Sequence, residues 1–379
     1  MAGGAERSLF ELAVALKDDG RVDPVVTVPR DRALAVALRA ESIRSVALPT
    51  PLWSPYDPDE FRTSVPLGGL ARRTRLTLAV ARRARPWVHW LRAERPDVVL
   101  TSTATIATPA LASALAGIPH VWWLQEFVTK DHGRSYMLGE HLSQRSIGWL
   151  SKVVVANSNV VKDHFSPPIP SEKMRVIYYG IRGGDTTPNR IDLPTLRVLL
   201  LGWQTPTKGQ KLALEATGIL SSGALRIQLR LVGPIGAAYR DELQELAARL
   251  RISDRVEIRD ATATPQDEFA WANVVLMCSD NEAFGRVTVE ALKSGRPVIG
   301  TRSGGTTELI SDGVDGLLFE PRNPQDLAGA LRRLGTEPGL LALMSHNARV
   351  GTRNRFTFES EVDAFVDVLA SASAVTDVP

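Results

Sequence analysis

The fold is decided by the run Val274-Val-Leu-Met-Cys-Ser-Asp-Asn-Glu-Ala-Phe-Gly-Arg-Val-Thr-Val-Glu290. Its apolar start is typical of a buried strand, and its last residues belong to a helix-forming run. Phe284-Gly285 lies between the two and predicts a tight turn. A strand, a turn and a helix in this order are the repeating unit of parallel α/β sheets, in which the helix begins at the carboxyl end of the strand.

The same alternation occurs twice along the chain. Predicted strands of the first half are 23–28, 45–48, 97–101, 120–124 and 153–156. Predicted strands of the second half are 198–201, 227–232, 255–258, 274–277, 297–300 and 316–319. A chain of 379 residues also exceeds what one compact core usually organises. We therefore expect two doubly wound, Rossmann-like domains, with ligand crevices at the carboxyl ends of their strands facing across one cleft.

The predicted first domain spans residues 1–180 and the predicted second domain spans residues 197–350. Residues 181–196 between them are rich in Gly, Pro, Asp and Asn and are predicted to be a linker. Gly3-Gly4 is typical of a turn between a first strand and a first helix, but only two residues precede it. We therefore expect the central first strand of the first domain to be missing, because of an upstream true start or a truncation.

Composition limits the class of protein. Apolar residues make up 44% and charged residues 23%, and no apolar stretch reaches the roughly 18 residues of a membrane span. The start lacks a secretory signal, and Cys278 is the only cysteine, so we expect a cytoplasmic protein without disulfides. A net charge of +3 is too small to indicate nucleic acid.

Glu282 and Glu290 flank the turn of the deciding run. Two glutamates at this spacing occur by chance in many helices. Here they lie at a strand end and a helix N-terminus, where backbone N–H groups and the helix dipole favour a diphosphate. The first carboxylate is then placed for sugar hydroxyls and the second for ribose hydroxyls.

Further motifs around this run make a family resemblance visible. They are Leu201-Gly-Trp-Gln-Thr-Pro-Thr-Lys208, Gly295-Arg-Pro-Val-Ile-Gly300, Gly304-Gly305-Thr-Thr-Glu308 and Gly313-Val-Asp-Gly-Leu-Leu-Phe-Glu-Pro321. Together with Glu282-Ala-Phe-Gly-Arg-Val-Thr-Val-Glu290, they closely resemble the family 4 glycosyltransferases of the GT-B fold, of the group 1 type. The resemblance is strong over residues 199–334, clear over 120–180 and weaker over 22–96.

The resemblance implies a retaining transferase that moves a sugar from a nucleotide diphosphate sugar to a hydroxyl of a glycan, a glycolipid or a cell-envelope precursor. It implies no metal and no other cofactor. It also implies that residues 351–379 form a helix that crosses back to the first domain. Gly3 and Gly4 resemble the family loop that approaches donor phosphate or acceptor, although a simple tight turn explains them nearly as well.

In the second domain, the resemblance assigns the donor sugar to Glu282, the ribose to Glu290 and the diphosphate to Lys208. Leaving-group stabilisation is then the main catalytic task. Trp203 stands where the family usually has a second, arginine cation. Further donor-binding candidates are Gly202, Phe284, Gly285 and Arg286, the last as a substitute for that arginine.

In the first domain, the resemblance places the acceptor side after the strand at residues 120–124. Glu126, Asp131 and His132 follow that strand, and a surface role for any of them is as well supported as a functional one. Glu126 and His132 are our catalytic candidates. The pair Trp122-Trp123, where many relatives carry a nearby histidine, is expected to belong to the core.

No metal site is predicted. Asp57-Pro-Asp59 has the spacing of a metal-binding motif but follows no strand, and the histidines and the cysteine lack zinc-ligand spacing. Cys278 is expected to be a small buried residue.

The segment Arg72–Arg95 is strongly basic and contains Trp87 and Trp90. It is either a solvated helix face or a surface that docks on anionic lipid from the cytoplasmic side, where tryptophan favours the interface.

Two other functions remain open. The first is that of an inactive GT-B protein that binds a nucleotide sugar or a partner transferase, as the absence of the arginine and of the usual histidine suggests, although Glu282, Glu290 and Lys208 argue against it. The second is that of a sugar-nucleotide epimerase, for which no matching acid and base groups are evident.

Overall fold

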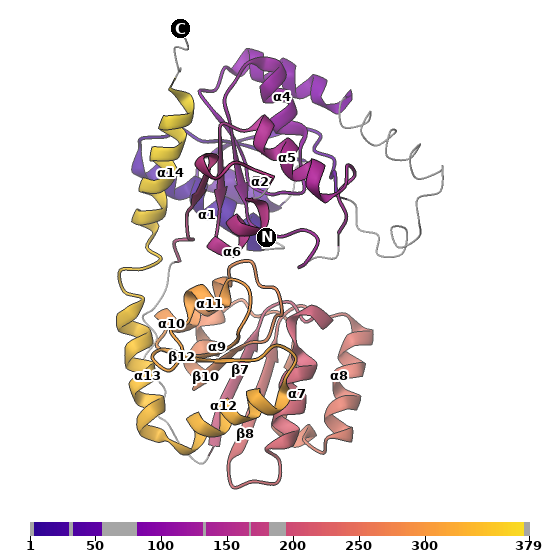
Figure 1. The fold of residues 1–379 in the computed structure, drawn as a ribbon, viewed down its shortest axis with the longest axis vertical. Coiled ribbons are helices and arrows are strands. Elements are labelled where there is room, and N and C mark those ends of the chain that lie inside the picture. The colour runs from indigo at the N-terminus through magenta and orange to yellow at the C-terminus, as the bar shows by residue number, and fades with distance from the viewer. Residues whose placement is uncertain are drawn as a thin grey trace. The chain divides into compact units, whose positions relative to one another are not determined.

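A computed structural model describes residues 4–29, 33–54, 82–131, 134–166, 168–181 and 195–374. These residues divide into two compact units (Figure 1). The first unit contains the described residues up to Gly180 and those from Phe358 onward, and the second unit is Ile181–Thr357. Gly3, His132, the pair Asp57 and Asp59, and most of the predicted linker lie outside the described residues.

The second unit is built on a six-stranded parallel sheet. Its strands, in the spatial order β12-β11-β10-β7-β8-β9, are β7 (Thr195–Leu201), β8 (Arg226–Val232), β9 (Val256–Arg259), β10 (Val274–Met277), β11 (Val298–Thr301) and β12 (Gly316–Phe319). Its helices are α7 (Gln210–Ile219), α8 (Ala237–Arg249), α9 (Pro265–Trp271), α10 (Arg286–Lys293), α11 (Thr306–Leu309), α12 (Pro324–Thr336) and α13 (Pro338–Gly351). Two short 3-10 turns are η2 (Pro206–Lys208) and η3 (Ser253–Arg255).

Alternating side chains of the central strands build two cores in this unit. Val198 and Leu200 pack with α7, α8 and α12 on one face, whereas Leu199 packs with α9, α10 and α13 on the other. Strands β10 and β11 are buried at every position because both of their faces are covered, whereas β8 and β9, at one side of the sheet, alternate with polar residues. Helices on both faces of a parallel sheet define a doubly wound domain.

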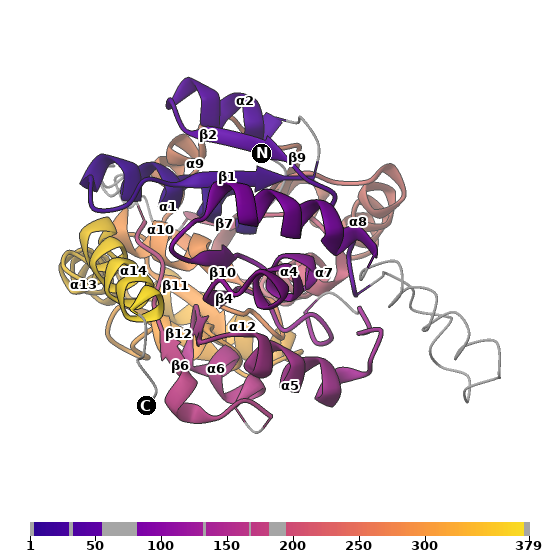
Figure 2. The same ribbon diagram turned by 90° about the horizontal axis from the view of Figure 1, so that it is seen from above.

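The first unit contains two separate parallel sheets. One pairs β1 (Val25–Val28) with β2 (Arg44–Ala47), which lie next to each other in Figure 2. The other has the order β3-β4-β5-β6, with β3 (Val99–Thr101), β4 (His120–Leu124), β5 (Val153–Ala156) and β6 (Met174–Val176). Among the described residues, no strand joins the two sheets, which agrees with the expectation that a central strand is missing.

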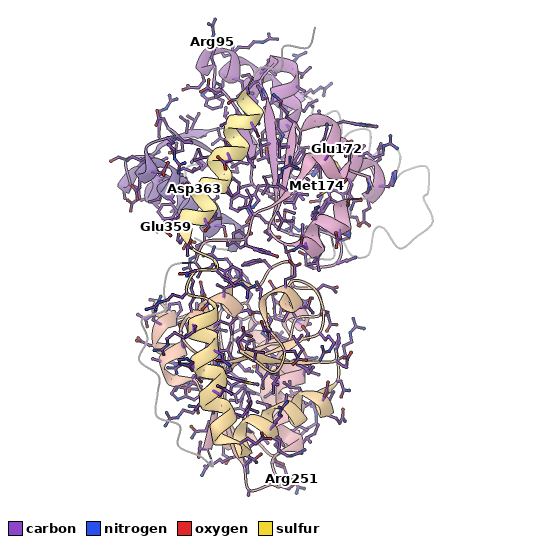
Figure 3. All side chains as sticks on the ribbon, turned by 60° about the vertical axis from the view of Figure 1, so that its left-hand side comes forward. Arg95, Glu172, Met174, Arg251, Glu359 and Asp363 are labelled. Atoms are coloured by element: carbon purple, nitrogen blue, oxygen red, sulfur yellow. The ribbon has the colours of Figure 1, made fainter. Side chains whose placement is uncertain are left out.

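The helices of the first unit are α1 (Gly4–Asp19), α2 (Ala33–Ala40), α4 (Thr108–Ala116), α5 (Glu140–Leu150), α6 (Asn159–Phe165), α14 (Phe358–Ser373) and the 3-10 turn η1 (Ser171–Lys173). Helix α14 packs against α1, and its Asp363, labelled in Figure 3, pairs with Arg21. Phe365 contacts the ring of Trp123 at a centroid distance of 4.9 Å, and Glu361 accepts a 2.8 Å hydrogen bond from the backbone N–H of Gly180. The C-terminal helix is therefore part of the first unit.

The described part of the basic segment is helical over residues 82–94. Trp87 is buried in this helix and donates a 2.9 Å hydrogen bond from Nε1 to the carbonyl of Pro49. The idea that Trp87 anchors a membrane interface is therefore wrong, because the side chain belongs to the core. Among the described residues, no helix is long and apolar enough to cross a bilayer.

Most of the predicted strands are confirmed, and those at 120–124, 153–156, 274–277 and 316–319 match without any change. The main corrections concern short or marginal segments. Strand β6 was not predicted, since three residues carry too little pattern. Strand β7 begins at Thr195, inside the predicted linker, because Leu196 is a core residue. The last helix begins at Phe358, after Phe356 with a positive φ of 59°.

Candidate functional site

The deciding run forms a loop at the carboxyl end of β10. The chain leaves the strand at Met277 and turns at Gly285, whose φ of 100° favours glycine. Helix α10 then begins, and its first N–H groups have no partner within the helix. Phe284 is buried, and its ring packs against that of Phe356 with the centroids 6.0 Å apart, so this aromatic contact holds the loop in place. This geometry leaves Glu282 beside a helix N-terminus.

Lys208 reaches the same place from the carboxyl end of β7. Its Nζ lies 2.7 Å from Oε2 of Glu282, and both side chains are partly exposed. The two residues are 74 positions apart in sequence, so the fold brings together the two main candidates of the sequence analysis. A cation and a carboxylate at a helix N-terminus can respectively bind a phosphate and accept hydrogen bonds from hydroxyl groups.

Glycine makes this approach possible. Gly209 has a φ of 76°, and a Cβ on it would lie 2.5 Å from the Cβ and the carbonyl oxygen of Cys278. The segment that carries Lys208 can therefore touch the loop after β10 only with glycine at this position. Cys278 is buried and burial raises the pKa of its thiol, so it acts as a packing residue.

A second glycine pair fixes the backbone of Glu282. The N–H of Gly305 donates a 2.7 Å hydrogen bond to the carbonyl of Glu282, and a Cβ on Gly304 would lie 2.5 Å from that oxygen. The loop that follows β11 thus packs backbone against backbone on the loop that follows β10. Gly304 and Gly305 belong to a family motif whose role was not predicted from the sequence.

The arginine position carries an exposed aromatic residue instead. Gly202 follows β7 with a φ of 141°, and a Cβ on the neighbouring Gly233 would lie 1.9 Å from the carbonyl oxygen of Gly202. Trp203 follows and is 53% exposed, whereas Gln204 is buried and donates from Nε2 to the carbonyls of Gly233 and Arg259. The side chain of Trp203 is therefore free to meet a ligand but adds no positive charge.

Two other candidates lie on α10. Arg286 is its first residue and Glu290 its fifth, and both are half-buried. Sequence reasoning missed three hydroxyl groups around the same loops, those of Ser279, Thr288 and Thr306. Each hydroxyl oxygen is buried, and none of the three has a hydrogen-bond partner among the described residues. Such orphans are uncommon in native proteins and often mark a ligand site, but serine and threonine carry no sequence signal for it.

The first unit has its own polar group, after β4. Glu126 is only 6% exposed, and its Oε1 accepts hydrogen bonds from Thr103 Oγ1 and, at 2.7 Å, from the N–H of Ala104. Burial, together with the charge of Asp131, raises the pKa of the Glu126 carboxyl to about 7. Asp131 accepts a 2.9 Å hydrogen bond from the N–H of Phe127. The structure therefore places two of the three acceptor-side candidates together.

The other residues of the first unit that the sequence singled out are either exposed or part of the core. Gly4 is exposed at the start of α1. Trp122 and Trp123 are fully buried, as expected for core residues. Within the residues that the structure describes, no group of three or more His, Cys, Asp or Glu side chains could hold a metal ion.

The architecture is that of the GT-B glycosyltransferases. HepE from Anabaena, solved with UDP and glucose, superposes with a TM-score of 0.76 at 23% identity, over 97% of this chain and 96% of that one. Sucrose-phosphate synthase from Thermosynechococcus elongatus gives 0.74 at 17% identity, over 98% and 94%. Both comparisons establish the fold.

Two family models then account for most of the sequence. The model of Glycosyltransferase Family 4 matches residues 2–182, and the model of Glycosyl transferases group 1 matches residues 187–351. This chain belongs to the family 4 glycosyltransferases of the group 1 type.

Curated relatives share part of the sequence. The D-inositol 3-phosphate glycosyltransferase of Streptomyces bingchenggensis is 36% identical over 196 residues, which is 48% of this chain and 42% of the relative. The enzyme of the same name from Acidothermus cellulolyticus is 32% identical over 223 residues, 54% of this chain and 49% of the relative. The chain thus spans about half the length of these relatives.

Proposed function

We propose that the chain is a retaining, metal-independent glycosyltransferase that uses a nucleoside diphosphate sugar. The observation that carries the proposal is the Lys208–Glu282 pair, 2.7 Å apart, at the N-terminus of α10. In this proposal, Lys208 and the first N–H groups of α10 bind the diphosphate, and Glu282 accepts hydrogen bonds from the donor sugar. Glu290, the fifth residue of the same helix, is assigned to the ribose by family resemblance.

In the proposed reaction, the acceptor hydroxyl oxygen attacks the anomeric carbon from the side of the leaving group. The bond between this carbon and the phosphate oxygen breaks, and the nucleoside diphosphate leaves with the bonding electron pair. The hydroxyl proton moves to the departing phosphate oxygen, so charge and atoms balance. Lys208 lowers the barrier by neutralising the charge that develops on the diphosphate, without a metal.

The acceptor is proposed to be a hydroxyl of a glycan, a glycolipid or a cell-envelope precursor, bound by the first unit near Glu126. The name of the curated relatives makes inositol 3-phosphate one compound to test. His132 remains a candidate by resemblance only.

The test is an assay with UDP-glucose and a panel of acceptors, with products analysed by NMR. We expect a product whose anomeric configuration matches that of the donor, and an unchanged rate in EDTA. An inverted product would contradict retention, and loss of the rate in EDTA would contradict metal independence. An epimerised free sugar would indicate the epimerase, and UDP binding without turnover across a donor panel would indicate the inactive form.

We also propose that the basic segment docks the protein peripherally on anionic lipid at the cytoplasmic face. The support is that Arg82, Arg83 and Arg85 are exposed on the helix at residues 82–94. Each basic residue near such a surface contributes on the order of 1 kcal/mol. Failure of the protein to sediment with phosphatidylserine vesicles at low salt would contradict docking.

A further inference from the structure

Three loops of the first unit meet at the carboxyl ends of its strands. The N–H of Trp53, in the segment after β2, donates to the carbonyl of Thr105, after β3, at 3.0 Å. The N–H of Met137, after β4, donates to the carbonyl of Trp53, also at 3.0 Å. The indole Nε1 of Trp53 adds a 2.7 Å bond to the carbonyl of Ala104. The segment at Trp53 is therefore fixed between the other two loops.

Two buried hydroxyl groups in these loops have no partner. Ser54 is 0% exposed and Tyr136 is 2% exposed, yet neither hydroxyl oxygen makes a hydrogen bond within the part of the chain that the structure describes. Tyr136 packs edge-on against Trp53, with ring centroids 5.6 Å apart. Leaving a buried polar group unsatisfied is costly, so two of them in adjoining loops call for an explanation. A bound molecule that supplies the missing partners provides one.

Glu126 adds an acceptor to these hydroxyls. Its Oε1 is occupied by Thr103 and Ala104, whereas within the described residues no hydrogen bond reaches its Oε2. Trp53 links the two groups, because it packs on Tyr136 and donates to the carbonyl of Ala104, whose own N–H donates to Glu126. Burial, together with the charge of Glu126, raises the pKa of the Tyr136 phenol. The set thus contains a phenol donor, a serine hydroxyl and a carboxylate oxygen. Groups that both donate and accept, such as alcohols, satisfy it.

The charges around the set oppose an anionic ligand. Asp131 accepts a hydrogen bond from the N–H of Phe127, which follows Glu126, and Glu140 accepts one from Thr129 Oγ1. Lys130 lies over the ring of Phe127. Arg134 is directed to the carbonyl of Ser54, at 3.4 Å from Nη1. Among the described residues of these loops, the three carboxyl groups of Glu126, Asp131 and Glu140 outnumber the two cations, Lys130 and Arg134. A phosphate placed here would meet like charge, whereas an uncharged hydroxyl compound would not.

The loop after β4 is also held in an uncommon conformation. Val128 is buried with a φ of 71°, and the N–H of Thr129 bonds back to the carbonyl of Phe127 at 2.9 Å. A γ-turn with positive φ is strained, and more so for a β-branched residue. Such strain persists where the surrounding structure enforces it, which is frequent at binding sites.

We propose that Ser54, Glu126 and Tyr136 form the acceptor-recognition site and that this site selects an uncharged polyhydroxylated compound, a sugar or a cyclitol, over its phosphorylated form. This assignment rests on the proposed function, since it names the class of acceptor. Its residues all belong to the first unit.

The test measures binding by saturation-transfer NMR and calorimetry, with UDP present. The probes are methyl α-glucoside, methyl α-mannoside and myo-inositol, each compared with a phosphorylated counterpart. The variants are S54A and Y136F. The matched control is Y179F, because the Tyr179 hydroxyl is also buried but already bonds to Gln125 and Asn157. UDP affinity is measured separately for every protein.

We expect at least one uncharged probe to bind the wild type, and to bind Y136F at least five times more weakly. Because the Tyr136 hydroxyl is unsatisfied in the free protein, Y136F should melt about 2–4 °C higher, whereas Y179F should melt lower. UDP affinity should stay the same in Y136F.

Several results would overturn the site. They are tighter binding of a phosphorylated probe than of its uncharged parent, equal binding by Y136F, a lower melting temperature of Y136F, or no binding of any uncharged probe while UDP binds. Binding of an uncharged probe without any binding of UDP would support the site and contradict the donor proposal.

Discussion

Each unit has a polar site at the carboxyl ends of its strands, and the two sites differ in burial and in the residues that build them. In the second unit, Lys208 and Glu282 are partly exposed, and glycines allow backbone to pack on backbone around them. In the first unit, Glu126 is buried and accepts hydrogen bonds from the Thr103 hydroxyl and the Ala104 N–H. Trp122 and Trp53 donate hydrogen bonds to the carbonyls of these same two residues.

The difference matches the chemistry of the proposed ligands. A diphosphate needs cations and backbone N–H groups, and glycine gives close access to both. A hydroxyl compound needs matched donors and acceptors, which are more selective when they are buried. We infer that charge recognises the donor and hydrogen bonding recognises the acceptor.

The largest expected effect breaks the charged site. Replacing Glu282 with alanine should lower kcat/KM about 100- to 1000-fold while the fold survives, because the group that we propose to contact the reacting sugar is lost. The measurement is the rate of UDP release from UDP-glucose with acceptor. Glu242→Ala is the matched control, since Glu242 forms a 2.5 Å pair with Lys211 on the surface of the same unit. Unchanged turnover in the Glu282 variant would contradict the site assignment.

The next effect concerns the glycines. Gly209→Ala should reduce the free energy of unfolding of the second unit by about 3 kcal/mol, because the left-handed backbone and the contact with Cys278 both oppose a Cβ. Urea denaturation measures this change. Gly329→Ala is the control: Gly329 lies in α12, an added Cβ would meet no atom within 4 Å, and the change should stabilise by about 0.5–1 kcal/mol. Similar effects of the two changes would show that close packing at Gly209 is unimportant.

These glycines also explain how much could be predicted. Close packing of one backbone on another can be recognised in the sequence, because it requires glycine. Gly209, Gly285 and Gly304 all have a positive φ, which would be strained for any other residue. The donor loop and its partner Lys208 were therefore visible before the structure. Strands such as β4 and β10 were equally clear, since both of their faces are buried.

The polar site of the first unit left no such mark. Ser54 and Tyr136 lie in loops whose residues meet only through tertiary structure, and their buried state depends on Trp53 and its neighbours. Glu126 could be proposed from its place after a strand, but its burial could not. Strand β6 was missed because its three residues give no measurable periodicity.

The pH dependence of stability provides a smaller effect, which tests whether Glu126 is buried while the site of the second unit is partly exposed. The pKa of Glu126 is raised from 4.5 to about 7, so the folded protein binds more protons than the unfolded chain between these values. Its contribution to stability is present below pH 4.5 and is lost as pH rises through 7, by at most about 3 kcal/mol. Glu126→Gln should lack this loss when urea unfolding is compared at pH 5 and pH 8.

The exposed Glu172 provides the control for that comparison, as Glu172→Gln makes the same charge change on the surface of the first unit. It should follow the wild type at both pH values. An equal pH dependence of Glu126→Gln and the wild type would show that the carboxyl is not buried in solution.

The smallest effect tests the missing cation. Trp203→Arg restores a charge at the exposed end of β7 and should tighten UDP binding about 3- to 10-fold, close to 1 kcal/mol. Calorimetry measures the affinity, and Trp203→Gln, which removes the indole without adding charge, is the control. Equal affinities of the two variants would show that the diphosphate does not pass Trp203.

The most direct test of the central claim is a calorimetric titration of the wild type, Lys208→Ala and Lys211→Ala with UDP. Lys208 is paired with Glu282 beside Gly209. Lys211, three residues further along the chain, is paired with Glu242 on the surface. We expect the wild type and Lys211→Ala to bind UDP equally and Lys208→Ala to bind at least tenfold more weakly. Equal binding by all three proteins would contradict a donor site at Lys208 and Glu282.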